Sequence, residues 1–292
     1  MKIAVLMQCH KNAKQIRALL KSFQHPDVHV FVHIDGKADL DESLLQMDWV
    51  TILPKEKRVN VKWACISQIE ATLQLIDTAG TYDRYDYYWL VSGQDILLKP
   101  ISHIVDFLEK EYKNGINFIN IIDSYNFGKG IYGSFDKRND IYYPSWMNGR
   151  QLSRRIIKRL WVEITGGYNK TFAYFQRNSG IVSYFGSQWW CLTNESIECI
   201  CKEKERFLGF FRNCSCPDES FFQTAFMESP YSELRKDMFL YVDWSEGNNS
   251  PNNLTLGDLV GISNTRFLIA RKIGNLDDFN KITEWIKNEE KN

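Results

Sequence analysis

The chain has 292 residues, of which 44% are hydrophobic and 14% aromatic, so it is long enough to bury one large core or two small ones. Its 36 Lys and Arg residues balance its 36 Asp and Glu residues, which excludes a bulk electrostatic field for binding nucleic acid or a membrane. Recognition must therefore come from local sites.

The N-terminal stretch MKIAVLMQCHKNAKQ is expected to form a first strand, because its apolar run is short and polar residues follow it. No run reaches the ~20 apolar residues that span a bilayer, and we expect a cytoplasmic protein. The seven cysteines include two C-x-C pairs, a spacing too short for the usual zinc knuckle. Reduced, mostly buried thiols are therefore expected.

Short apolar runs alternate with helical patterns through the first half of the chain. Strands are predicted at 2–9, 28–35, 50–54, 85–93 and 117–122. Helices are predicted at 13–23, 41–47, 66–79 and 102–112. This alternation of predicted strands and helices indicates βαβ units, and hence an α/β fold with a mostly parallel central sheet flanked by helices.

The second half begins with a loop-rich, Tyr- and Gly-rich region, about 124–185, around a basic helix at 151–161. Strands are predicted within 187–193, 238–244 and 266–272, and helices at 194–206, after 218 and at 277–290. Because the sequence contains no internal repeat and no evident linker, we expect residues 1–292 to form one domain with a variable insert at about 124–185.

Ligands of parallel sheets bind at the carboxyl ends of the strands, so residues that follow predicted strands are candidate contacts. His10 either packs structurally or meets a ligand, and Asp35 either forms a turn or meets a ribose or base. Trp63 is either buried or stacks on a planar ring. Asp95, in SGQD, is either a turn former or part of a site.

The stretch CPDESFFQTAF, 216–226, places Asp218 and Glu219 before an apolar run. Asp218 fits an N-cap and Glu219 fits a first helical turn, but either carboxylate could also act as a base. The only D-x-D, Asp39-Leu40-Asp41, lies at a helix start and is interpreted as a cap. Arg271 and Lys272 end a strand, where they are either solvated or able to hold a diphosphate.

The basic helix at 151–161 has two alternative interpretations. Its basic residues alternate with apolar ones, so it could rest on an anionic membrane and approach a lipid-linked acceptor. It could equally pack on the domain as an amphipathic surface helix. The residues concerned are Arg154, Arg155, Lys158 and Arg159, with Ile156, Ile157, Leu160 and Trp161 between them.

Eight stretches of the chain carry a family resemblance. They are HKN at 10–12, VHIDGKAD at 32–39, VKWACISQIEATL at 61–73, YYWLVSGQDILLKP at 87–100, GSQWWCLT at 186–193, PDESFFQT at 217–224, YVDW at 241–244 and FLIARK at 267–272. In this order they resemble the core-2/I-branching β-1,6-N-acetylglucosaminyltransferase and peptide xylosyltransferase family of glycosyltransferases, above all its short bacterial members.

The resemblance implies a GT-A-type fold, a UDP-sugar donor, inversion at the anomeric carbon and no bound metal or other cofactor. By position it implies a catalytic base at Glu219 and diphosphate contacts at Arg271 and Lys272. The implied nucleotide contacts are His10, Asp35 and Trp63, with Trp63 against the uracil. Candidate sugar or acceptor contacts in the matching stretches are Asp95, Trp190 and Trp244.

The resulting hypothesis is transfer of β-linked N-acetylglucosamine to a hydroxyl of a glycan or lipid-linked glycan acceptor in bacterial surface polysaccharide synthesis. Transfer of xylose or galactose, and a non-catalytic carbohydrate-binding relative, remain alternatives. We expect neither the disulfides nor the Golgi anchor of the animal enzymes. Their acceptor contacts have no counterpart here, so the acceptor is not inherited from them.

Overall fold

The computed structural model describes residues 1–122, 143–147, 151–164, 179–246, 250–260, 262 and 266–289. Most of the insert predicted at about 124–185 lies outside these residues. Its described parts include the short 3-10 helix η3 (Ser145–Met147) and the helix α5 (Leu152–Ile164), which covers the predicted basic helix.

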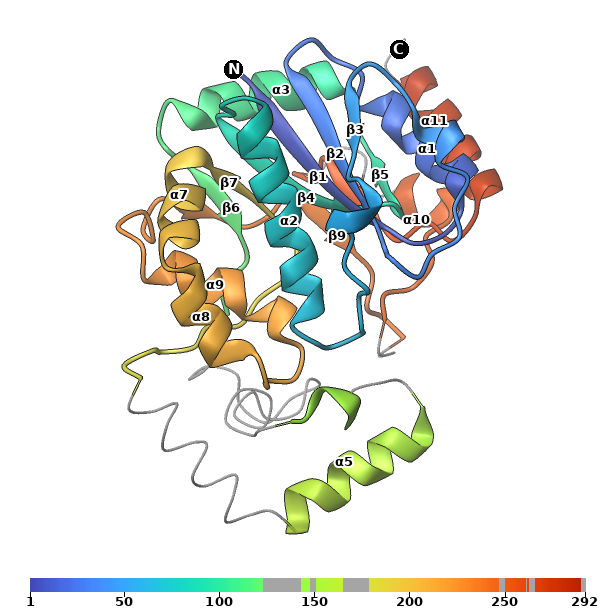
Figure 1. Ribbon diagram of the computed structural model, residues 1–292. Helices are drawn as coiled ribbons and strands as arrows, with labels where there is room; N and C mark the ends of the chain where they lie inside the picture. The colour runs from blue at the N-terminus through green and yellow to red at the C-terminus, as the bar shows by residue number, and fades with distance from the viewer. Residues whose placement is uncertain are drawn as a thin grey trace.

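A seven-stranded sheet forms the centre of the molecule (Figure 1), in the order β3-β2-β1-β4-β7-β6-β8. Four of its six neighbouring pairs are parallel, and β7 runs antiparallel to both of its neighbours. The predicted α/β architecture with a mostly parallel sheet is confirmed. The strands are β1 (Ile3–Cys9), β2 (Val28–Ile34), β3 (Val50–Ile52), β4 (Tyr87–Ser92), β6 (Asn117–Ile119), β7 (Trp190–Thr193) and β8 (Arg235–Lys236).

A second, three-stranded sheet was not predicted. It contains β5 (Asp95–Leu97), β10 (Ile269–Arg271) and β9 (Leu240–Val242), with β10 in the middle. The strand predicted at 266–272 therefore pairs with the residues that follow SGQ and not with the central sheet. This pairing brings residues 95–97, from the first half of the chain, beside residues 269–271 near its C-terminal end.

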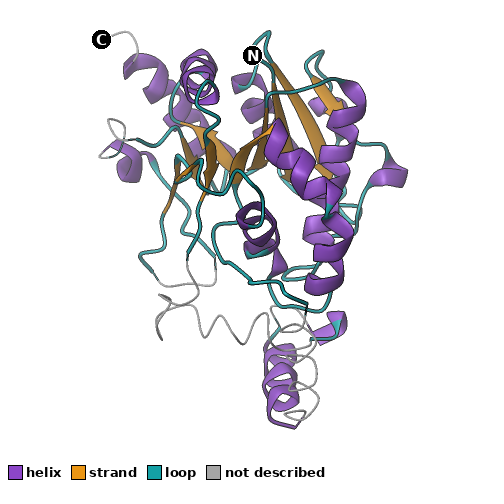
Figure 2. Ribbon diagram, turned by 90° about the vertical axis from the view of Figure 1, so that its left-hand side faces the viewer, coloured by secondary structure: helices purple, strands orange, loops and turns teal. Residues whose placement is uncertain are grey.

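Helices cover both faces of the central sheet (Figure 2). Alternate residues of β1 enter two different hydrophobic cores, because Val5 packs in one and Leu6 in the other. The helices are α1 (Ala13–Ser22), α2 (Ser67–Tyr82), α3 (Ile101–Tyr112), α7 (Asn194–Lys202), α8 (Lys204–Phe211), α9 (Phe221–Met227), α10 (Leu256–Val260) and α11 (Leu276–Glu289). The 3-10 helices are η1 (Glu42–Leu45), η2 (Lys55–Lys57), η3 and η4 (Pro217–Glu219).

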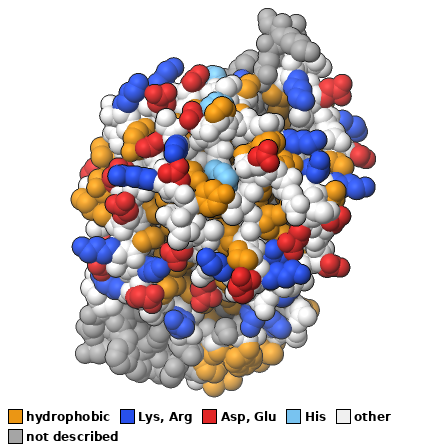
Figure 3. Space-filling model, turned by 45° about the horizontal axis from the view of Figure 1, so that its top comes forward, with side chains coloured by type: hydrophobic (Ala, Val, Ile, Leu, Met, Phe, Trp, Pro, Cys, Tyr) orange, Lys and Arg blue, Asp and Glu red, His pale blue; other side chains and the backbone are white. Residues whose placement is uncertain are grey.

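The surface in Figure 3 carries positive and negative side chains interspersed over one face, as the balanced composition predicts. All seven cysteines are free thiols, and Cys9, Cys65, Cys191 and Cys214 are buried. None of the described helices is long and apolar enough to cross a membrane.

Two capping predictions have different outcomes. Asp41 is the N-cap of η1, since its side chain accepts a hydrogen bond from the Ser43 amide, as expected. The prediction that Asp218 caps a helix is wrong. Pro217 starts a 3-10 turn one residue earlier, so Asp218 lies inside η4, and the N-cap of α9 is Ser220.

Candidate functional site

A cavity of about 970 Å³ opens at the carboxyl ends of β1, β2 and β4. The register aligns these ends, because Cys9 pairs with Ile34 and Gln8 pairs with Ser92. The volume is within the range of cofactor and ligand clefts. Residues predicted from the sequence that line it are His10, Asp35, Trp63, Asp218, Glu219, Trp244 and Arg271.

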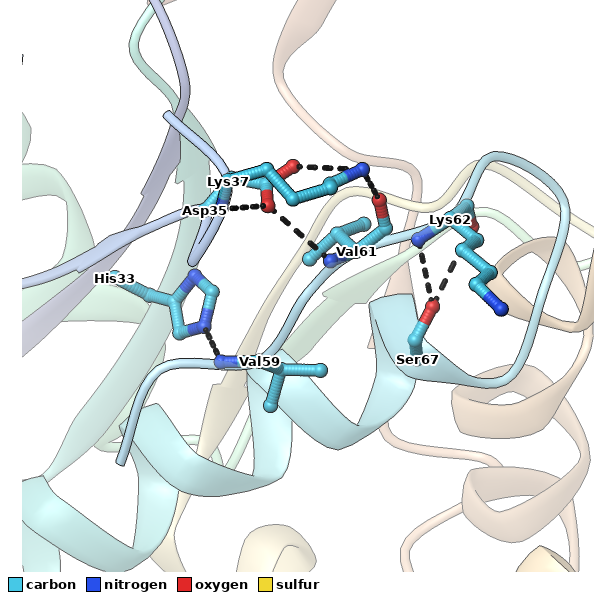
Figure 4. A network of polar contacts seen from close by, with 7 residues as sticks. All are labelled: His33, Asp35, Lys37, Val59, Val61, Lys62 and Ser67. Atoms are coloured by element: carbon cyan, nitrogen blue, oxygen red, sulfur yellow. Dashed lines mark hydrogen bonds and ion pairs between the residues drawn. The ribbon is translucent and has the colours of Figure 1, made fainter. Parts of the chain in front are cut away.

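One wall of the cavity is held by polar contacts between β2 and the loop that precedes α2 (Figure 4). The buried ring of His33 accepts a hydrogen bond at Nε2 from the Val59 amide, 2.9 Å away. Burial lowers the pKa of His33 to about 4, so the ring is neutral and keeps its acceptor. These contacts fix the loop that carries Trp63.

Asp35 continues the same wall. Its Oδ1 accepts from the amides of Lys37, at 3.0 Å, and Val61, at 3.3 Å, while Lys37 Nζ lies 3.6 Å from Oδ2. The carboxylate is therefore both a turn former and a cavity residue, and the two interpretations of the sequence are compatible.

Two glycines allow the strands and loops around the cavity to approach closely. A Cβ on Gly93, in SGQD, would lie 2.9 Å from the Cβ of Cys9. A Cβ on Gly186 would lie 1.7 Å from the carbonyl oxygen of Asn120, and the Gly186 amide donates to the carbonyl of Glu219 at 2.9 Å. Gly186, which sequence reasoning missed as a site residue, thus supports the backbone of the candidate base.

The acidic pair lies on η4, whose backbone geometry is unusual. Cys216, directly before η4, has φ 53°, and Ala64, directly after Trp63, has φ 59°. The Cys216 amide donates to the carbonyl of Ala64 at 3.2 Å. Left-handed non-glycine residues are uncommon and cluster at functional sites, so this bonded pair joins the segment of Trp63 to that of Asp218 and Glu219.

Arg271 brings a buried guanidinium to the cavity. Its side chain is 11% exposed and its Nε lies 3.7 Å from Oδ1 of Asp95, the residue directly opposite it in the β5–β10 pairing. The guanidinium also stacks on Trp189, with Cζ 4.0 Å from the ring centroid. Nε and Nη1 donate no hydrogen bond within the part of the chain that the structure describes.

Burial sets the electrostatics of this pair. It raises the pKa of Asp95 to about 6, a shift that the positive charge of Arg271 opposes only in part. It also lowers the pKa of Arg271, with Asp95 opposing. One carboxylate therefore incompletely compensates a desolvated guanidinium that faces the cavity, and an anionic ligand would complete its coordination.

Asp95 itself is not a cavity residue, which corrects its prediction as a sugar or acceptor contact. Its side chain is 2% exposed and absent from the cavity lining, because β5 turns it inward beneath Arg271. Its Oδ2 accepts from the Ser92 amide at 2.8 Å. Asp95 therefore positions Arg271.

Lys272 occupies a different place from its neighbour. It does not line the cavity, and its Nζ donates to Oγ of Ser250, a lining residue, at 3.1 Å. Of the predicted basic pair, Arg271 lines the cavity, while Lys272 contacts the lining residue Ser250.

Tryptophans occupy several positions around the site. Trp63 and Trp244 line the cavity and are 43% and 39% exposed, so both offer a ring face to a ligand. The prediction that Trp190 contacts sugar or acceptor is wrong. Its ring is fully buried in the core, because β7 begins there and directs it inward, and its neighbour Trp189 lines the cavity instead.

No metal centre is built from the residues that the structure describes. Among them, no group of three or more His, Cys, Asp or Glu side chains could hold a metal ion. The expected independence from metal stays a prediction that needs a binding measurement.

The family model described as "Branch: Core-2/I-Branching enzyme" matches residues 3–266, which is most of the chain. The match begins at β1 and ends before β10. It therefore includes the lining residues of the cavity up to Arg266, and Phe267 and Arg271 lie beyond it. A search of curated proteins finds no match to the chain.

Proposed function

Because the chain belongs to the core-2/I-branching family, and is therefore a glycosyltransferase with a GT-A-like fold, we propose that it is a metal-independent, inverting enzyme. It transfers a sugar, N-acetylglucosamine by preference, from a UDP-sugar to a hydroxyl of a glycan acceptor. Arg271 binds the diphosphate and Glu219 is the catalytic base.

The buried guanidinium of Arg271 carries this proposal. It lines the cavity, it contacts Asp95 and Trp189, and its Nε and Nη1 donate no hydrogen bond among the described residues. Unpaired buried donors are costly, and phosphate oxygens are acceptors that arginine binds through charge-assisted, often bidentate hydrogen bonds. The positive charge of Arg271 would stabilise a diphosphate whose negative charge grows as the sugar leaves, and no metal ion would be needed.

Glu219 supplies the other half of the reaction. Its carboxylate accepts the proton of the acceptor hydroxyl as that oxygen attacks the anomeric carbon. The bond from this carbon to the diphosphate oxygen breaks at the same time, and UDP departs with its electron pair. One carboxylate suffices because the diphosphate is already a good leaving group.

The uridine is assigned to the wall of the cavity that His10, Asp35 and Trp63 line. His10 and Asp35 follow β1 and β2 at the sheet edge where nucleotides bind in such folds, and Trp63 presents an exposed ring beside them. We assign the base to Trp63 and the ribose to Asp35. Trp244, which also lines the cavity, is our candidate for stacking on the sugar or acceptor, since aromatic rings pack on the apolar faces of sugars.

A melting-temperature screen in excess chelator tests this function. UDP, UDP-N-acetylglucosamine, UDP-xylose and UDP-galactose are compared, and a ligand at 100 times its Kd is expected to stabilise the protein by ~2.7 kcal/mol. Stabilisation only after adding manganese would contradict metal-independent binding. Release of free sugar from the stabilising donor, measured without acceptor, separates an enzyme from a non-catalytic carbohydrate-binding relative.

A further inference from the structure

The helix α5 exposes its apolar side chains instead of burying them. An amphipathic helix on a globular protein normally turns its apolar side to the core. Here residues 152, 156, 160 and 164 recur every four positions along one face, and Ile157 lies beside them. The exposed fractions are 70% for Leu152, 53% for Ile156, 41% for Ile157, 52% for Leu160 and 79% for Ile164.

The opposite side of α5 contacts the rest of the protein. Lys158 donates from Nζ to Oγ of Ser215 at 2.6 Å and lies 4.0 Å from the ring centroid of Tyr143. Trp161 and Val162 are half-buried. The helix therefore meets the domain through the side that carries Lys158, Trp161 and Val162. The exposed isoleucine and leucine side chains lie on the other side, so packing on the domain does not explain them.

This anchor places α5 close to the candidate base. Ser215 lies two residues before η4, which carries Asp218 and Glu219, and the Tyr143 amide donates to the carbonyl of Asn213 at 2.8 Å. Figures 1 and 2 draw α5 at the end of the molecule beyond α8 and α9, away from the N-terminus. Hydrophobic side chains gather at the same lower end in Figure 3.

Charge decides which partner fits this face. The helix LSRRIIKRLWVEI has four basic residues and one acidic residue in a chain whose formal net charge is zero. Arg154 and Arg159 are exposed beside the apolar residues. A second copy of the chain, docked face to face, would bring these like charges together. Anionic lipid headgroups over an apolar layer match both features.

We propose that α5 docks this protein on the surface of an anionic phospholipid bilayer. The apolar side chains enter the headgroup boundary and the arginines bind lipid phosphates. Docking would hold the mouth of the cavity near the lipid surface and favour a lipid-linked acceptor; this last consequence rests on the proposed function, whereas the docking does not.

Vesicle co-sedimentation of the full chain tests the docking. The vesicles contain phosphatidylglycerol mixed with phosphatidylcholine, or phosphatidylcholine alone. One variant carries Leu152→Ser, Ile156→Ser and Leu160→Ser, and a second carries Arg154→Glu and Arg159→Glu. A charge-matched control carries Lys110→Glu, in the last turn of α3, and Lys113→Glu, at the C-cap of α3, where both lysines are exposed. Unfolding midpoints and UDP affinity are measured for each protein.

We expect the wild type and the α3 control to bind the anionic vesicles alike. Each α5 variant should lose at least ~10-fold in partitioning, and the wild type should lose a similar factor on phosphatidylcholine alone. Unchanged UDP affinity and melting would show that this loss is local and independent of the donor site.

Equal partitioning of wild type and α5 variants would overturn the proposal, as would a wild type that stays in the supernatant. If the wild type instead dimerises in solution and the apolar variant does not, α5 is a protein interface and the lipid assignment is wrong. If the wild type binds the vesicles but does not bind UDP, the proposed function is wrong and the docking proposal stands.

Discussion

Replacing Arg271 with methionine removes the guanidinium while keeping a long apolar side chain against Trp189. In the wild type, Arg271 contacts Trp189 at 4.0 Å and Asp95 at 3.7 Å, and its Nε and Nη1 have no hydrogen-bond acceptor within the described residues. If a UDP phosphate accepts at least one of these N–H groups, the variant loses one charge-assisted bond. Such a bond contributes ~1.5–3 kcal/mol, which corresponds to ~10-fold to ~150-fold in Kd.

Isothermal titration of UDP in excess chelator measures this loss. The matched control is Arg266→Met, because Arg266 also lines the cavity but is exposed and lies 3.5 Å from Asp237. We expect the control to bind UDP within ~3-fold of wild type, since exposed ion pairs contribute little. A Kd for Arg271→Met that is also within ~3-fold of wild type would refute the assignment of Arg271 to the diphosphate.

The free energy of unfolding distinguishes a role of Arg271 in binding the diphosphate from a purely structural role. Removing Arg271 leaves Asp95 buried without its cation, and breaking such a pair costs ~3–5 kcal/mol. Adding Asp95→Asn removes the stranded charge, so the double variant should regain much of the unfolding free energy in denaturant titrations. It should not regain UDP affinity. Recovery of both together would show that Arg271 acts on binding only through the fold.

The remaining predictions concern the base, the loop wall and a glycine. Glu219→Gln should lose at least ~100-fold in transfer with UDP affinity unchanged, whereas Asp218→Asn should keep transfer within ~10-fold; steady-state kinetics that reverse this order would contradict the assignment. Burial lowers the pKa of His33 from 6.5 to about 4, so the unfolded chain binds this proton more readily and stability is lost as the pH falls through that window. Protonation of His33 should therefore lower the free energy of unfolding by ~3 kcal/mol at low pH. The His33→Gln variant, unfolded in denaturant at a series of pH values, should lack this dependence of stability on pH. Gly186→Ala would place a Cβ 1.7 Å from the Asn120 carbonyl, so denaturant unfolding should show a loss of at least ~2 kcal/mol, and wild-type stability would contradict the close approach.

Much of the central sheet could be predicted because its strands are short apolar runs separated by helical patterns. The carboxyl ends of β1 and β2 then indicated His10 and Asp35, since parallel strands end at the same edge. The helix predicted at 194–206 is two helices, α7 and α8, which meet at Glu203. A break between two patterns of the same period leaves little trace in a sequence.

The errors at the site come from tertiary pairing. Trp189 and Trp190 are adjacent and chemically identical, and only the start of β7 decides that the first lines the cavity and the second is buried. Asp95 lies at a predicted strand end, but the antiparallel β5–β10 pairing turns it beneath Arg271. That pairing joins residues far apart in the chain, so no local pattern encodes it.

A crystal structure of the Glu219→Gln variant with UDP-N-acetylglucosamine, grown in excess chelator, would show whether Arg271 binds the diphosphate without a metal ion. We expect a pyrophosphate within hydrogen-bond distance of Arg271, no metal beside it, and the anomeric carbon between the phosphate and residue 219. A pyrophosphate bound elsewhere, or bound only when manganese is supplied, would contradict this expectation.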